Sequence, residues 1–190
     1  MPPRTPSREP AQAGAARASL VAKLHELEER LQHTQAELLA LGGESLPGLY
    51  LVFEVAGHRA LLASHRVAEI VQLVATTPLA GSPRHVLGTF LYRGGPVVAV
   101  DLAALMGTSR EPGLDAQIVI LAGAPPVGLV VDQIERLSES PRIFAGDASA
   151  AMPESWRGSP FVAGLCVEQG EVLPLVDPQP ILATIEREAA

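Results

Sequence analysis

The chain repeats one strand–turn–strand pattern at a distance of 76 residues. Residues 88–101 align with residues 164–177, and both segments begin with glycine, carry a second glycine at the turn and end in aspartate. Glycine tolerates the positive φ that tight hairpin turns need, so each copy is typical of a β-hairpin. Two copies are too few for a solenoid or a propeller. The repeat therefore predicts two related β lobes, as in an internally duplicated small barrel or sandwich.

Composition limits the kind of protein that can be built around these hairpins. The chain has 190 residues, of which 47% are hydrophobic and only 4% aromatic, so we expect one domain with a core of aliphatic side chains. The formal charge of −7, without a basic stripe interleaved with aromatics, argues against nucleic acid as a partner. No apolar run approaches the length of about 18 residues that suggests a membrane span. We therefore predict a cytoplasmic protein without direct membrane insertion.

The residues that usually carry catalysis or bind metals do not form a recognisable set. Cys166 is the only cysteine, which excludes an internal disulfide and a metal site of several cysteines. The five histidines are scattered, at positions 25, 33, 58, 65 and 85, without the spacing of metal ligands. Ser64 and His65 are adjacent, but the sequence has no nucleophile elbow and no identifiable acid partner. The sequence thus predicts no catalytic residue, metal or cofactor, and no enzymatic activity.

The N-terminal part differs from the rest of the chain. Residues 1–16 are rich in proline and alanine without apolar periodicity, and we expect a disordered leader there. Residues 17–43 predict an amphipathic helix in which leucines alternate at steps of four and three, a seam made of Leu20, Leu24, Leu27, Leu31, Leu38 and Leu41. Lys23 and Glu28 fall at flanking positions that favour a parallel dimer. The sequence leaves two interpretations open, namely self-association through this seam and packing of the helix on its own domain.

From residue 48 the pattern becomes strand-like. We expect strands at 49–55, 60–63, 117–122 and 127–134, a long loop at 138–160 and a final helix at 180–188. Ile134 and Leu137 take the places in the second half that Val67 and Ile70 hold in the first. Asp101 and Asp177, which close the two hairpins, are expected to cap the helical turns that follow them. These elements predict a domain at 48–187, with approximate halves at 48–107 and 116–187.

The order of these elements resembles the CheW-like coupling domain of bacterial chemosensory systems over about residues 48–184. The resemblance rests on five segments in the order found in that family, namely Tyr50–Phe53, Val67–Ile70, Gly88–Leu102, Val127–Ile134 and Val162–Asp177. It implies a mainly β fold of two intertwined five-stranded barrel lobes, preceded here by an N-terminal helical extension. The chain departs from the family at Leu91 and Tyr92, where Asn-Leu is usual before Arg-Gly.

The resemblance also implies a function without catalysis. It suggests an adaptor that couples the cytoplasmic tip of chemoreceptors (methyl-accepting chemotaxis proteins) to the regulatory domain of a CheA-type histidine kinase, recruited to membrane-associated receptor arrays. The implied kinase-binding residues are Val67, Glu69 and Gly88, and the implied receptor-binding residues are Arg93, Gly128, Ile134 and Leu137. CheW-like homologues are further candidate partners.

Two alternatives stay open at the level of sequence. A divergent CheW-like paralogue would bind only the receptor or only the kinase. A small β-barrel enzyme or ligand-binding protein would instead use the groove between the lobes, and it would be distinguished by turnover or by a tight small-molecule ligand.

Overall fold

The computed structural model describes residues 19–24, 26–27, 30, 42–108, 110–146, 152 and 154–188. Its strands are β1 (Gly42–Ser45), β2 (Leu49–Val55), β3 (His58–Ala63), β4 (Val67–Gln72), β5 (Val86–Tyr92), β6 (Gly95–Asp101), β7 (Gln117–Leu121), β8 (Val127–Val131), β9 (Gln133–Glu139), β10 (Arg142–Phe144), β11 (Val162–Glu168) and β12 (Glu171–Val176). The helices named with them are α2 (Leu102–Leu105) and α4 (Pro178–Glu188), with short 3-10 turns at Ser64–Arg66 and Glu154–Trp156.

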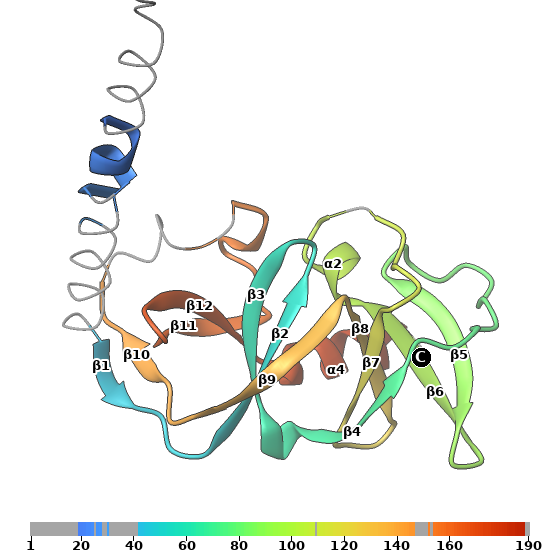
Figure 1. Ribbon diagram of the computed structural model, residues 1–190. Helices are drawn as coiled ribbons and strands as arrows, with labels where there is room; N and C mark the ends of the chain where they lie inside the picture. The colour runs from blue at the N-terminus through green and yellow to red at the C-terminus, as the bar shows by residue number, and fades with distance from the viewer. Residues whose placement is uncertain are drawn as a thin grey trace, which may run out of the picture.

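The strands form two sheets that lie side by side in Figure 1. The first has the order β1-β10-β11-β12-β3-β2-β9 and the second has the order β4-β7-β8-β6-β5. In each sheet one hairpin, β11–β12 or β5–β6, joins the neighbouring pair through a parallel contact, β12 to β3 and β6 to β8. The mainly β, two-lobed fold is therefore confirmed, and β1 and β10 extend one lobe beyond five strands.

The two halves of the sequence exchange strands between these lobes. The sheet that contains β2 and β3 takes β9, β10, β11 and β12 from the second half. The sheet that contains β7 and β8 takes β4, β5 and β6 from the first half. The pairing registers confirm the predicted correspondence, because Ile70 lies opposite Val119 and Leu137 lies opposite Leu51. Val67 and Ile134 are equivalent in the same way, because Val67 lies opposite Leu121 and Ile134 lies opposite Phe53. Each lobe therefore needs both halves of the chain.

Alternation along the strands divides the apolar residues among three core clusters. On β2, Leu51, Phe53 and Val55 face a large cluster between the two sheets, which Trp156 and Ile181 also join. Tyr50 and Val52 point the other way, into the interior of the first lobe. A third cluster around Phe90, Ile118 and Ile120 fills the second lobe. One face of a strand such as β2 therefore packs in the core between the two sheets, and its other face packs in the core of its own lobe.

Three local expectations need correction, and a fourth falls on residues that the structure does not describe. The run 127–134 is divided between β8 and β9 at Asp132, where the chain passes from one sheet to the other. The Asp132 carboxylate accepts a hydrogen bond from the Ala56 N–H at 2.6 Å. The expected loop 138–160 contains the end of β9 and all of β10. Gly42 and Gly43, expected to end the helix, begin β1, which pairs with β10. The expected leader 1–16 lies outside the described residues, as does the helix between 31 and 41.

The capping prediction is confirmed in both halves. Asp101 accepts a hydrogen bond from the Ala103 N–H at 3.0 Å, and Asp177 accepts one from the Gln179 N–H at the same distance. Each carboxylate satisfies an amide that the first turn of a helix leaves without an internal partner. The aspartates that end the repeated hairpins therefore start helices.

Candidate partner-binding surface

The turn of the β5–β6 hairpin presents Arg93 to solvent. Arg93 and Gly94 both have positive φ, 49° and 82°, as a two-residue hairpin turn requires. The Arg93 side chain is 74% exposed. A residue other than glycine rarely adopts this backbone conformation, so the hairpin places a long cation at its tip at some conformational cost.

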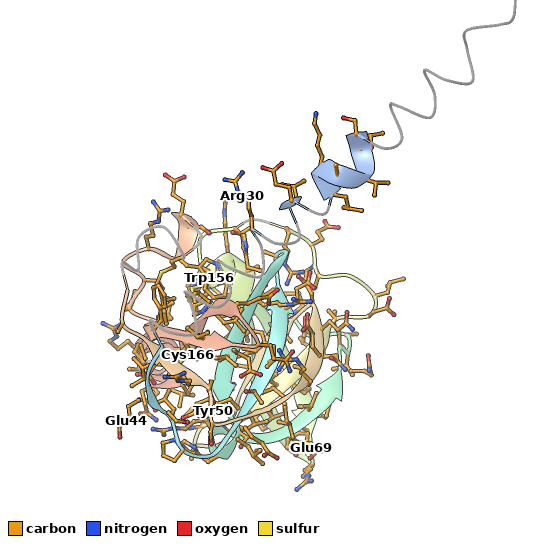
Figure 2. All side chains as sticks on the ribbon, turned by 60° about the vertical axis from the view of Figure 1, so that its left-hand side comes forward. Arg30, Glu44, Tyr50, Glu69, Trp156 and Cys166 are labelled. Carbon is orange, nitrogen blue, oxygen red and sulfur yellow. The ribbon has the colours of Figure 1, made fainter. Side chains whose placement is uncertain are left out.

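One hydrogen bond to β4, at the opposite edge of the sheet, and one ring contact hold this cation in place. The carboxylate of Glu69 on β4 accepts from Arg93 Nη2 at 2.6 Å and from the Tyr92 hydroxyl. The Arg93 guanidinium carbon also lies 5.2 Å from the centre of the Tyr92 ring, within the range of a cation–π contact. The hydrogen bond to Glu69 raises the pKa of Tyr92, which therefore keeps its proton and remains a donor. Figure 2 shows Glu69 at the end of the molecule away from Arg30 and the N-terminal helical residues.

An exposed leucine precedes the polar residues in the sequence of the hairpin, on the face of β5 opposite Tyr92. Leu91, two residues before Arg93, is 79% exposed, while Val167 at the equivalent place in β11 is only 2% exposed. We call Glu69, Leu91, Tyr92 and Arg93 the hairpin-tip surface. An exposed apolar side chain next to an oriented arginine is a combination typical of protein–protein contact.

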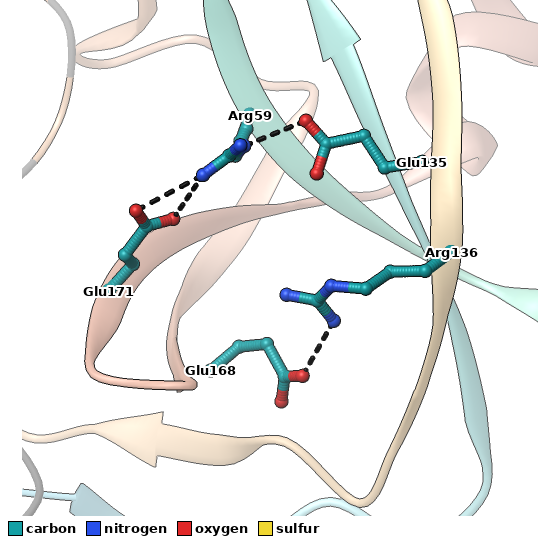
Figure 3. Close-up of polar contacts among 5 residues, drawn as sticks. All are labelled: Arg59, Glu135, Arg136, Glu168 and Glu171. Atoms are coloured by element: carbon teal, nitrogen blue, oxygen red, sulfur yellow. Dashed lines mark hydrogen bonds and ion pairs between the residues drawn. The ribbon is translucent and has the colours of Figure 1, made fainter.

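The other lobe has a polar contact at the equivalent place. Arg136 of β9 donates to Glu168 of β11 at 2.8 Å, and these two positions correspond to Glu69 and Tyr92 in the second lobe. Figure 3 shows this pair beside Arg59, which bonds Glu135 at 2.7 Å and both carboxylate oxygens of Glu171. The contacts of Arg136 with Glu168 and of Arg59 with Glu135 join strands that do not pair through their backbones, whereas Arg59 and Glu171 lie on the paired strands β3 and β12. The sequence analysis missed them because the partners lie 32 or more residues apart.

The described residues give little support to a metal site, a reactive cysteine or a catalytic pocket. They contain no group of three or more histidine, cysteine, aspartate or glutamate side chains arranged to hold a metal ion. Cys166 is buried, and burial raises its pKa to about 11, so it stays a thiol at neutral pH. A hollow of about 290 Å³ is lined by Leu79–Pro83, Val86, Val98 and Ile185, without an acid, base or nucleophile pair.

Comparison with known proteins decides the family. A model of the CheW-like domain matches residues 49–186, most of the chain. The chain belongs to the CheW-like domain family. The crystal structure of the scaffolding protein TtCheW from Thermoanaerobacter tengcongensis matches with a TM-score of 0.58 and 22% identity, over 70% of this chain and 90% of that one. A search of curated proteins found no match.

Membership in the CheW-like family confirms the predicted resemblance and the mainly β fold. The family is one of non-catalytic scaffolds, so the prediction that the chain is not an enzyme is also confirmed. Among the described residues, no helix has the length and apolar character needed to cross a membrane.

The CheW-like fold places the three implied kinase-binding residues in different environments. Glu69 belongs to the hairpin-tip surface, and Val67 is partly buried against the core between the sheets. Gly88 is buried, with φ of 129°, and a Cβ there would lie 2.3 Å from the Thr77 carbonyl oxygen. Of the three, Glu69 alone therefore belongs to the hairpin-tip surface.

The four implied receptor-binding residues are also separated. Arg93 is at the hairpin tip, whereas Leu137 is 55% exposed on β9 in the other sheet. Ile134 is partly buried, and its N–H donates to Gln117 Oε1 at 2.7 Å. Gly128 is buried, and a Cβ there would lie 2.5 Å from Ile118 Cγ2. The structure therefore brings Arg93 next to Glu69 and leaves Leu137 as a separate exposed position.

Proposed function

We propose that this CheW-like chain is an adaptor that couples chemoreceptors to a CheA-type histidine kinase in a bacterial chemosensory pathway. The observation that carries the proposal is the hairpin-tip surface, in which Arg93 is exposed yet held in place by Glu69 and Tyr92. The proposed partners are the regulatory domain of the kinase, the receptor tip and CheW-like homologues. The proposed location is the cytoplasm, at membrane-associated receptor arrays.

The contact between Glu69 and Arg93 gives this coupling a physical basis. Family resemblance assigns Glu69 to the kinase and Arg93 to the receptor, and the two side chains share one ion pair at 2.6 Å. An acidic group of a receptor that binds Arg93 competes with Glu69 for the guanidinium. Because both side chains are at least one-third exposed, the pair itself contributes little to folding and is free to exchange partners.

The test measures binding of the full chain to a kinase regulatory domain and to a receptor cytoplasmic fragment from the same genome, by calorimetry. We expect Arg93→Asn to weaken receptor binding by about tenfold or more, as for an interface hot spot. Asparagine tolerates the positive φ of this turn, so the thermal midpoint should not change. Gln169→Asn is the matched control, because Gln169 has φ of 50° in the equivalent turn of the other lobe.

The outcomes separate the proposed adaptor from its alternatives. Binding to both partners, with the loss confined to Arg93→Asn, supports coupling. Binding to the receptor alone or to the kinase alone would identify a one-sided paralogue. No binding to either partner would overturn the proposal and return attention to a small ligand.

A further inference from the structure

The N-terminal helical residues carry a row of leucines that the folded domain does not cover. Leu20, Leu24 and Leu27 are 67%, 57% and 61% exposed. Both Figure 1 and Figure 2 show the described helical turns standing away from the two sheets. The described part of the seam therefore does not pack on its own domain, which was one of the two interpretations that the sequence left open.

We propose that this helix pairs in parallel with the same helix of a second copy of the chain. The leucine spacing continues in the sequence through Leu31, Leu38 and Leu41, and an alternation of four and three is the period of a left-handed two-stranded coiled coil. A second copy is the occupant that presents the identical spacing. Each exposed leucine of one helix then enters the space between leucines of the other.

The charges flanking the seam favour the parallel arrangement. With Leu24 at position a of the heptad, Lys23 falls at g and Glu28 at the e position that faces it from the second helix. Lys23 is exposed in the described helix. The pair would form twice, once on each side of a symmetric dimer. About three heptads with Thr34 in the seam make a weak coiled coil, so dimerisation depends on concentration.

The dimer would carry two CheW-like domains on one coiled coil. Resting on the proposed adaptor function, this makes the molecule bivalent, so that binding of one domain to an array raises the effective concentration of the other. Figure 2 shows Glu69 at the end of the domain away from the helix, and Arg93 and Tyr92 bond to it, so this part of the hairpin-tip surface is free in the dimer.

Cysteine cross-linking of the full chain tests the pairing and its direction. Position a residues meet their own copies in a parallel coiled coil, so we expect Leu24→Cys to form a disulfide-linked dimer on mild oxidation. Ala22→Cys, at the outward f position, should remain largely monomeric. The native Cys166 is buried with a pKa of about 11 and does not interfere. Equal cross-linking at both positions would overturn the proposal.

Light scattering of the full chain provides the second measurement. We expect the mass to rise from monomer toward dimer with concentration, and Leu24→Glu to weaken dimerisation by about tenfold or more. Ala22→Glu adds the same charge off the seam and should dimerise as the unchanged chain does. A monomer at every concentration would overturn the pairing even if kinase and receptor binding were intact. If the unchanged chain is monomeric at every concentration and Leu24→Glu still loses receptor binding, the seam binds the receptor and not a second copy.

Discussion

Gly88 and Gly164 occupy equivalent positions in β5 and β11, yet their surroundings differ. Gly88 has φ of 129°, and a Cβ there would lie 2.3 Å from the Thr77 carbonyl oxygen and 2.7 Å from its carbon. Thr77 pairs with Thr89 in an isolated bridge that brings this segment against β5. A Cβ at Gly164 would meet nothing within 4 Å. One glycine of the repeat is therefore required by close packing, and the other is not.

The substitution Gly88→Ala should accordingly destabilise the fold by roughly 2 to 5 kcal/mol, from backbone strain and overpacking together. Gly164→Ala should change the free energy of unfolding by less than about 0.5 kcal/mol, as at a site without steric conflict. Urea unfolding of both variants checks this. Similar effects at the two positions would mean that the Thr77 segment moves away to accommodate the methyl group.

Among the elements, each lobe has a polar pair at an equivalent place, which joins two strands of the same sheet that do not pair through their backbones. β4 reaches β5 through Glu69 and Tyr92, and β9 reaches β11 through Arg136 and Glu168. In both lobes a charged side chain of one edge strand bonds to the residue just before the hairpin turn. The chemistry has changed between the copies while the location has been kept, which indicates that the contact itself matters for the closure of each lobe.

A double-mutant cycle tests the contribution of the closing pair in the first lobe. Arg136→Glu places two carboxylates together and should destabilise the chain by about 1 to 2 kcal/mol, since both side chains are largely buried. Adding Glu168→Arg should recover about 1 kcal/mol by restoring opposite charges. Thermal and urea unfolding provide the two readouts. Additive losses without recovery would show that the pair contributes nothing to closure.

The sequence predicted the individual strands and helices better than it predicted which strands pair with one another. The hairpins, the caps at Asp101 and Asp177 and the correspondence of Ile70 with Leu137 followed from local patterns of glycine, aspartate and alternation. The seven-stranded sheet did not, because β1 and β10 are short and their pairing depends on residues about 100 positions apart. The buried positions of Gly88 and Gly128 were equally hidden, since glycine has no side chain whose polarity indicates an interior site.

In the whole molecule, a charged cluster lies where the two lobes meet. Arg110, in the segment between the halves, bonds to Asp132 after β8 and lies 3.6 Å from the Asp101 carboxylate at the end of β6. Asp132 also accepts from the Ala56 N–H in the turn between β2 and β3 of the other sheet. Arg110 thus lies between the carboxylates of Asp101 and Asp132, and Asp132 links the second lobe to the β2–β3 turn of the first.

The cluster should make stability depend on pH through Asp101. Burial raises the pKa of Asp101 above its ordinary value of 3.8, against the opposing effect of Arg110. The folded chain therefore binds this proton more tightly than the unfolded chain, so ionised Asp101 opposes folding above the raised pKa. The penalty fades as the pH falls toward 3.8.

Asp101→Asn should remove this penalty and keep an oxygen for the Ala103 N–H. We expect urea unfolding to show the greatest gain of the variant over the unchanged chain near neutral pH, with a gain that shrinks as the pH is lowered. Asp177→Asn, at the equivalent cap outside the Arg110 cluster, controls for the loss of a capping carboxylate. If Asp101→Asn instead lost stability at neutral pH, the ion pair with Arg110 would outweigh the cost of burying the charge. The joint between the lobes would then be held by charge as well as by its apolar core.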